Sequence, residues 1–320
     1  MKTMLRGALL LLLFAANAAA QTWPAKPVRL IVADAAGGAP DQLARILSAK
    51  LAEGFGQQVI VDNRPGAGGT LGADLAAKAT ADGYTLLLST TAIWAILPSL
   101  KKDLPYDPVR DFAPISRLAT TSNVLVINTS LPARSVAELV QLSKSKPGAL
   151  NYASAGIGTP AHLAGEMLNL LAGIKMTHVP YKGAAPGLLD VIAGNAHVII
   201  TSPISAGAHM NAGRVRALAT TGIERNPSLP ELPPIADTVP GYEITQSWGV
   251  VAPAATPQPV LRRANEEIVR AMALVDVRER VLKMGAVPAG DSPQAFEAFM
   301  ARERQRLAEV ITKSGIVLSE

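Results

Sequence analysis

The chain has 320 residues, of which 49% are hydrophobic and 4% aromatic, and its formal net charge is +5. This composition can fill an aliphatic core for one large or two ordinary domains, and it excludes an intrinsically disordered chain. Basic residues are scattered among acidic ones, so we expect no nucleic-acid partner, and the lack of cysteine excludes disulfides, thiolate metal sites and lipid attachment at a cysteine.

The first 20 residues have the pattern of a secretory signal peptide. Lys2 and Arg6 precede the apolar stretch Ala8–Ala16, and Ala18-Ala19-Ala20 is a small-residue cleavage site. We expect cleavage after Ala20; an uncleaved N-terminal membrane anchor is the alternative. Because no later stretch has 18 uninterrupted apolar residues, the sequence predicts an exported, soluble protein of the bacterial periplasm.

Beyond this segment the chain alternates apolar strand patterns with amphipathic helix patterns. Such alternation predicts an α/β fold with mostly parallel sheets flanked by helices. The expected strands are Val28–Ala33, Gln58–Asp62, Thr85–Ser89, Asn123–Asn128, Leu150–Ala153, His197–Thr201, Val215–Thr220 and Gly249–Ala252.

The first expected strand is followed by a glycine loop and then a helix. Ala36, Gly37 and Gly38 form the loop, and Asp41 follows at the start of the helix. Unpaired backbone N–H groups and the helix dipole converge at such a loop and favour an anion. Asp41 could orient the loop amides, or it could be a simple cap or a surface charge.

A second glycine-rich stretch, Gly66–Gly72, precedes another helix but does not fit dinucleotide binding. Leu71 stands at the third glycine position of the G-x-G-x-x-G pattern, and no acidic residue ends a strand about 20 residues later. We interpret this stretch as a tight turn that lets a helix pack closely on a strand.

The most informative segment is Asn151–His162. It predicts a short strand, a loop rich in glycine and hydroxyl groups, and a helix with Thr159 as its cap and Pro160 at its first position. This arrangement is an anion site built without any cation. The candidate ligand-binding residues in it are Ser154, Gly156, Gly158, Thr159 and His162.

Ser154 could also be the nucleophile of a hydrolase, with His162 or His178 as its base. The segment lacks the first glycine of the G-x-S-x-G elbow, so we interpret Ser154 as a neutral donor to a bound carboxylate. The helix dipole disfavours a protonated His162, for which a structural hydrogen bond is the alternative to ligand contact.

Hydroxyl groups follow two further strands. Ser89 and Thr90 end one strand, and Ser202 follows another, at the carboxyl ends where open α/β sheets bind ligands. Asp190 could orient loop amides or be a surface charge. The four histidines do not have metal-ligand spacing, so we expect neither a metal nor a cofactor.

The chain changes character after Pro253, where three helical patterns follow a proline-rich connector. We expect crossovers near Thr120–Asn123 and Pro240–Ser247. These crossovers predict a discontinuous first lobe, residues 21–122 and 246–320, and a second lobe, residues 123–245.

Segments spread over nearly the whole mature chain combine into one specific pattern. They are Pro27–Val32, Gly37–Arg45, Val61–Gly69, Asp82–Leu86, Asp107–Pro114, Ala153–Leu163, Val179–Gly183 and Pro240–Tyr242. In this order they resemble the tripartite tricarboxylate transporter substrate-binding proteins, also called the Bug family of TctC-like periplasmic receptors. The resemblance implies a two-lobed Venus-flytrap receptor, not an enzyme. Such a receptor closes on a small carboxylate and delivers it to membrane permease subunits.

The resemblance also implies that backbone amides and hydroxyls of both lobes hold the ligand. Carried over to this chain, they belong to Ala36–Asp41 with Ser89 and Thr90, and to Ser154–Thr159 with His162, Asp190 and Ser202. We expect a monomer. A periplasmic ligand sensor for a signalling partner is the first alternative, and a serine hydrolase is the second.

The first-lobe loop departs from the family pattern. Asp34 lies in a segment that usually carries an aromatic residue and prolines, Pro40 replaces a threonine, and Leu97 replaces an asparagine. If Asp34 faces the pocket, its charge would repel a polycarboxylate or pair with a ligand amine; if it faces solvent, it would do neither.

Overall fold

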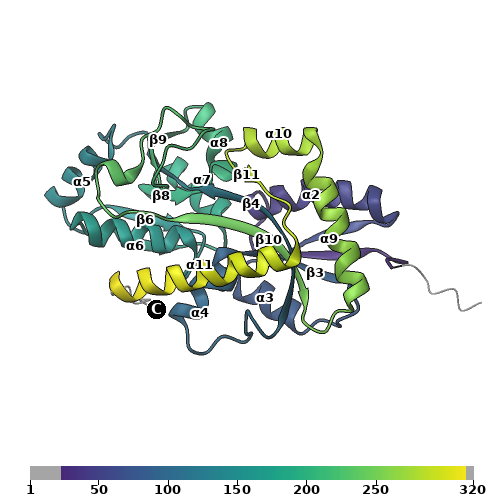
Figure 1. Ribbon diagram of the computed structural model, residues 1–320. Helices are drawn as coiled ribbons and strands as arrows, with labels where there is room; N and C mark the ends of the chain where they lie inside the picture. The colour runs from purple at the N-terminus through teal and green to yellow at the C-terminus, as the bar shows by residue number, and fades with distance from the viewer. Residues whose placement is uncertain (1–22, 315–320) are drawn as a thin grey trace, which may run out of the picture.

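The computed structural model describes residues 23–314, which form two β-sheets flanked by helices (Figure 1). The expected signal segment lies outside the described residues. The fold is α/β and two-lobed, as the sequence predicts. Within residues 23–314, none of the helices is long and apolar enough to cross a membrane.

The first sheet has six strands in the order β11-β4-β10-β3-β1-β2. They are β1 (Val28–Val32), β2 (Val59–Asn63), β3 (Thr85–Thr90), β4 (Phe112–Ser122), β10 (Thr245–Pro253) and β11 (Val287–Pro288). The helical segments of this part of the chain are α2 (Ala39–Phe55), η1 (Ala67–Gly69), α3 (Thr70–Ala77), η2 (Ala92–Ile96), α4 (Leu97–Leu100), α9 (Gln258–Ala273), α10 (Val275–Lys283) and α11 (Pro293–Ser314).

The second sheet has five strands in the order β7-β6-β8-β5-β9. They are β5 (Val124–Asn128), β6 (Asn151–Ser154), β7 (Thr177–Pro180), β8 (Val198–Thr201) and β9 (Val215–Thr220). Its helices are α5 (Val136–Ser145), α6 (Pro160–Ala172), α7 (Ala184–Ala193) and α8 (Pro203–Asn211), and η3 (Ile235–Asp237) precedes the return to the first sheet.

Both sheets are mixed rather than mostly parallel, which corrects the expected strand directions within the predicted fold class. β1 pairs in parallel with β2 and β3, and β6 with β7 and β8. The antiparallel pairs involve β4, β10 and β5, the strands next to the crossings between the sheets. An apolar run in the sequence marks a strand, but it does not tell from which end a strand enters its sheet.

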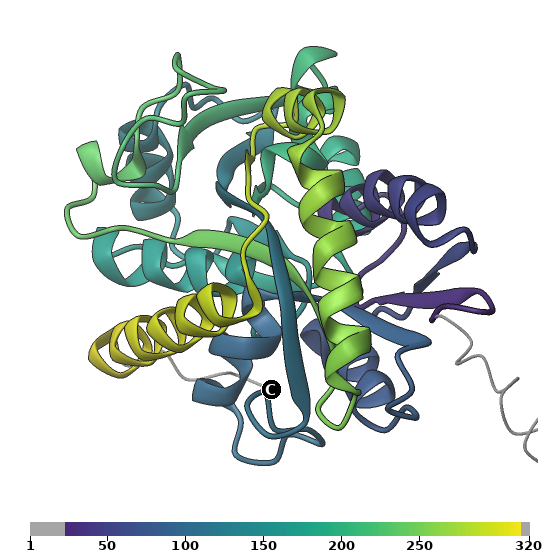
Figure 2. The ribbon, with the colours of Figure 1, turned by 45° about the vertical axis from the view of Figure 1, so that its right-hand side comes forward.

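The sequence also missed β4, β7 and β11. β4 carries serine, threonine and proline, and β7 and β11 are short, so none of them has the apolar run that marked the other strands. In Figures 1 and 2, β4 and β10 are the long strands that run from the first sheet toward the second.

The chain passes from the first sheet to the second at Asn123 and returns through residues 221–244. These two passages are bonded to each other. The backbone N–H of Asn123 donates to Thr221 Oγ1 at 2.7 Å, and Thr221 Oγ1 donates to the carbonyl of Ile244 at 2.5 Å. We keep the division into residues 21–122 with 246–320 and residues 123–245 as a proposal, because it assigns one sheet to each lobe.

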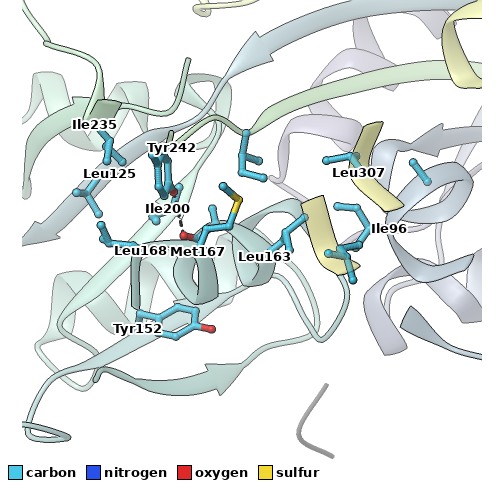
Figure 3. Packing of buried hydrophobic residues seen from close by; sticks show 14 of the residues in the cluster. Ile96, Leu125, Tyr152, Leu163, Met167, Leu168, Ile200, Ile235, Tyr242 and Leu307 are labelled. Carbon is cyan, nitrogen blue, oxygen red and sulfur yellow. Dashed lines mark hydrogen bonds between the residues drawn. The ribbon is translucent and has the colours of Figure 1, made fainter. Parts of the chain in front are cut away.

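The C-terminal helix α11 packs against η2, α4 and β4 of the first lobe. Phe296 meets Trp94 edge to face, with ring centroids 5.4 Å apart. Leu307 belongs to the same buried cluster as Leu163 of α6 and Ile96 (Figure 3). The apolar core is therefore continuous between the two lobes.

Candidate functional site

A cavity lies between the two lobes and is lined by residues from both. The first-lobe side is built by the loop after β1, the start of α2, the end of β3 and the glycine turn before α3. The second-lobe side is built by the starts of α6, α7 and α8. The lining residues are Ala33, Asp34, Ala39, Pro40, Gly68, Thr90, Ala92, Ala155, Thr159, Pro160, Ala161, Ala184, Thr201, Ser202, Ser205 and Gln246.

Four of the described α-helices begin at this cavity. The first residues of α2, α6 and α7 line it, and so does the residue that caps α8. The first N–H groups of a helix have no partner within the helix, and the dipole adds partial positive charge there. None of the described lining residues is Lys, Arg or His, so the partial positive charge that these residues can offer an anion is that of the backbone amides.

The start of α6 is organised by Thr159, as the sequence predicts. Thr159 Oγ1 accepts the N–H of His162 at 3.3 Å and donates to the carbonyl of Gly156 at 2.7 Å. Pro160 at the first position has no N–H, so the N–H of Ala161 is the first that α6 itself cannot satisfy. Ala161 lines the cavity.

The start of α8 repeats this design in a helix that the sequence predicts between two strands without giving its bounds. Ser202 caps it, with its Oγ accepting the N–H of Ser205 at 3.3 Å, and Pro203 takes the first position. Both serines line the cavity. Ser202 was a predicted site residue; the cap–proline pair Ser202-Pro203 was the signal that could have located α8 and with it Ser205.

Asp41 supports the first-lobe loop from behind. Its carboxylate is buried, and it accepts the N–H of Gly37 at 2.9 Å and Nε of Arg45 at 3.0 Å. Burial alone would raise the pKa of Asp41, but the bonds from Arg45 and Gly37 outweigh it and lower the pKa. Asp41 therefore orients the loop, which was one of its two predicted roles, and it does not line the cavity.

Asp34 is the one charged side chain among the described residues that line the cavity. It is half-buried, and its Oδ1 accepts the N–H of Ala35 at 2.7 Å. The backbone N–H of Ala184, the first residue of α7 in the other lobe, also acts on this carboxyl. Burial raises the pKa of Asp34 to about 7, against the lowering effect of the Ala35 and Ala184 N–H groups and with a further increase from Asp41. The side chain thus faces the pocket.

Ser154 lies behind the cavity, not in it. Its side chain is fully buried, its Oγ lies 2.7 Å from Nε2 of His178, and it accepts the N–H of Gly156 at 3.1 Å. The ring of His178 is stacked between the rings of Tyr152 and His162. Its centroid lies 4.9 Å from that of Tyr152 and 4.1 Å from that of His162. This placement corrects the prediction that Ser154 donates to the ligand, and it leaves a hydrolytic Ser154 without access to a substrate.

His162 also lies outside the cavity and is 1% exposed. Its Nδ1 accepts the N–H of Gly158 at 3.2 Å, which is the structural hydrogen bond expected from the sequence as the alternative to ligand contact. Burial lowers the pKa of His162 to about 4, and burial together with the neighbouring His162 lowers the pKa of His178 to about 3.

Several other predicted residues lie beside the cavity and do not line it. Side chains alternate along a strand, so Thr90 faces the cavity while Ser89 faces the other way. Asp190 is six residues along α7, about 9 Å from its start, and accepts from Tyr181 and Asn195. The remaining residues of this kind are Ala36, Gly37, Gly38, Gly156 and Gly158.

Glycines allow the lobes to approach. A Cβ on Gly68 would overlap the carbonyl oxygen of Ile157, and one on Gly156 would lie 3.2 Å from the backbone nitrogen of Gly68. Across the same cleft, Gln42 Nε2 donates to the carbonyl of Ile204 at 3.2 Å. The lobes are therefore in direct contact around the cavity.

Among residues 23–314 there is no group of three or more His, Asp or Glu side chains placed to hold a metal ion. The buried pair His162 and His178 therefore does not form such a group with a carboxylate. The lining of the cavity offers backbone and side-chain hydrogen-bonding groups and one carboxyl group.

Comparison with known proteins agrees with this geometry. Residues 43–316 match the family described as the tripartite tricarboxylate transporter family receptor, TctC. The chain belongs to this receptor family. It is 35% identical to the protein BugT of Bordetella pertussis over 306 residues, which cover 95% of this chain and 94% of BugT.

Solved structures of receptors share the fold. R. palustris Rpa4515 with adipate superposes with a TM-score of 0.89 and 35% identity, covering 92% of this chain and 99% of Rpa4515. The periplasmic binding protein BugD superposes with a TM-score of 0.88 and 31% identity, covering 92% of this chain and 99% of BugD. The chain is thus a Bug-family periplasmic solute-binding receptor and not an enzyme.

Proposed function

We propose that this receptor captures a small carboxylate-containing metabolite between its lobes and delivers it to the permease of a tripartite tricarboxylate-type transporter. The observation that carries the proposal is the convergence of four helix starts on a cavity whose described lining has no cationic side chain. Converging amides suit a carboxylate, which accepts several hydrogen bonds at once. The adipate bound to Rpa4515 supports the same ligand class.

The mechanism follows from the position of the cavity. Thr159, Ala161 and Ser202 are in one lobe, while Thr90 and the start of α2 are in the other. A ligand that bonds to both sets makes all of its contacts only when the lobes are together, so it shifts the open–closed equilibrium toward the closed form. We propose that the permease recognises this closed form.

Two further parts of the proposal concern the mature protein. We propose that export removes the first 20 residues, so that N-terminal sequencing of protein recovered from the periplasm reads from Gln21. We also propose that the receptor acts as a monomer, which light scattering of the purified mature chain would test.

A thermal-shift screen of straight-chain mono- and dicarboxylates of three to eight carbons tests the ligand class. A ligand that binds only the folded protein raises its melting temperature with concentration. The primary amides of the same acids are the matched controls, because they keep the chain and lose the anion. A shift with the amides but not with the acids would overturn the proposal.

One variant tests the helix starts directly. Ala161→Pro removes a single N–H from the first turn of α6, where proline is tolerated, and we expect carboxylate affinity to fall at least about tenfold. The control is Ala137→Pro, at the same position of α5, whose start does not line the cavity. Equal affinities for the two folded variants would contradict the assignment of α6 to the ligand.

A further inference from the structure

The Asp34 carboxyl group lies at the start of a helix that belongs to the opposite lobe. It accepts the N–H of Ala35 beside it, and the backbone N–H of Ala184, the first residue of α7, acts on it from the other lobe. Gly183 precedes Ala184, and a Cβ at that position would overlap Asp34 Oδ1. The first-lobe loop therefore closes onto the start of α7, with a carboxyl group between them.

This contact changes what the cavity offers to a ligand. The starts of α2, α6, α7 and α8 all face the cavity, and each can accept a carboxylate. The start of α7 already holds the protein's own carboxyl group. A ligand carboxylate can use the other three helix starts, but on the α7 side it would meet Asp34, with Asp41 contributing further negative charge behind it.

We propose that Asp34 is the specificity-determining residue of the cleft and restricts the ligand to a monocarboxylate with a hydrogen-bond donor at its other end. Hydroxyl, amide or ammonium groups satisfy that description. The inference rests on the proposed carboxylate-binding function and narrows its ligand class. A second ligand carboxylate would lie against an anion in a partly buried site, where like charges repel strongly.

A purely structural role for Asp34 makes a different prediction. If Asp34 only held the lobes together, its loss would lower the affinity for every ligand by the same factor. If it selects the ligand, its loss changes the ratio of affinities between ligands that differ at one end. The ratio is therefore the measurement that separates the two roles.

Calorimetry with acids of equal length measures this ratio at pH 8, where the Asp34 carboxyl is mostly ionised. The six-carbon set is adipate, 6-hydroxyhexanoate and 6-aminohexanoate, and the corresponding acids with three to eight carbons cover other lengths. We expect the wild type to bind the hydroxy or amino acid at least tenfold more tightly than the dicarboxylate of its length. In Asp34→Asn we expect that ratio to fall at least tenfold, with dicarboxylate affinity rising.

The control is Asp276→Asn, which changes the net charge equally at an exposed carboxylate on α10 and should leave the ratio unchanged. Asp34→Ser serves as the second variant in case Asp34→Asn does not fold. An unchanged ratio in the folded Asp34 variants overturns this inference alone. Failure of the wild type to bind any of the acids overturns the proposed function as well.

Discussion

The Ser154 hydroxyl lies 2.7 Å from Nε2 of His178, in a buried cluster behind the ligand cavity. The same oxygen accepts the N–H of Gly156 at 3.1 Å, at the turn that leads toward α6. Ser154 therefore connects the ring stack to the loop that carries Thr159. We therefore expect its contribution to binding to be indirect, through the position of that loop.

The first prediction separates stability from affinity at Ser154. Ser154→Ala leaves a buried nitrogen of His178 and the N–H of Gly156 without this partner, which should lower the free energy of unfolding by about 1–3 kcal/mol. We expect carboxylate affinity at 25 °C to change less than about threefold, since Ser154 does not touch the cavity. Chemical denaturation and calorimetry measure the two quantities. A large loss of affinity without a loss of stability would restore Ser154 as a ligand contact.

The second prediction concerns acid stability and the stacked pair His162 and His178. Burial lowers the pKa of both, to about 4 and about 3, below the usual 6.5. Between pH 6.5 and 4 the unfolded chain therefore binds protons that the folded protein does not. The stability that is present above pH 6.5 is lost as the pH falls through this window, and the melting temperature should fall with it.

The raised pKa of Asp34 has the opposite effect on stability as the pH falls. Between pH 3.8 and about 7, the folded protein holds a proton on Asp34 that the unfolded chain releases, so this group stabilises the folded protein at lower pH. The measurement is therefore made in the Asp34→Asn background. His178→Phe in that background keeps a stacked ring and should flatten the melting curve between pH 6.5 and 4.5. An equally steep curve in this variant would contradict the assignment.

The parts of the site that could be predicted from sequence are local. Thr159 caps α6 and Pro160 begins it because the rule involves only neighbouring residues, and Gly173 ends the helix in a left-handed conformation for the same reason. The strand–loop–helix pattern located both glycine loops, and the resemblance to receptors implied the two-lobed fold. These features need no knowledge of how the lobes meet.

Side-chain direction and contacts between the lobes could not be predicted in the same way. Ser89 and Thr90 are both hydroxyl residues at one strand end, and only the register of β3 decides which of them faces the cavity. Asp34 and Gly183 are far apart in sequence, so their close approach follows from the relative position of the lobes. Sequence reasoning could therefore name Asp34 as unusual without deciding where it points.

The third prediction tests the approach of the lobes at Gly68. Gly68 has a φ of +69°, and a Cβ there would overlap the carbonyl oxygen of Ile157 in the other lobe. Gly68→Ala should therefore hinder closure and weaken ligand binding at least about tenfold, because the closed form becomes less populated. Small-angle scattering should show that the variant stays more open with ligand than the wild type does.

Gly56→Ala is the matched control for backbone strain. Gly56 has a φ of +65° and ends α2, and a Cβ at this position would have no atom within 4 Å. Both variants should lose about 1–2 kcal/mol of stability through the left-handed backbone, and only Gly68→Ala should lose affinity. The same affinity loss in both would show that strain, and not the contact between the lobes, is responsible.

The fourth prediction couples ligand affinity to pH through Asp34. The pKa of its carboxyl is raised to about 7 where the lobes enclose it, and exposure in an open form should return the pKa toward 3.8. Closure then takes up a proton between these values, so a lower pH favours the closed, ligand-binding form. For a closed-form pKa of about 7, affinity for a carboxylate should rise about tenfold from pH 8 to pH 6.

Other groups do not produce this change in the same range. His162 and His178 keep their lowered pKa values inside the second lobe, Asp41 has a lowered pKa, and simple carboxylic acids stay mostly ionised at pH 6. Calorimetry from pH 6 to 8 should therefore give a carboxylate affinity that is independent of pH for Asp34→Asn and one that rises toward low pH for Asp276→Asn. Because protonation removes the charge that opposes a second carboxylate, the wild-type affinity for adipate should rise more steeply than that for 6-hydroxyhexanoate. If the affinities for the two ligands change with pH in parallel, protonation of Asp34 does not affect which ligand is preferred. Asp34 would then have a role in closure alone.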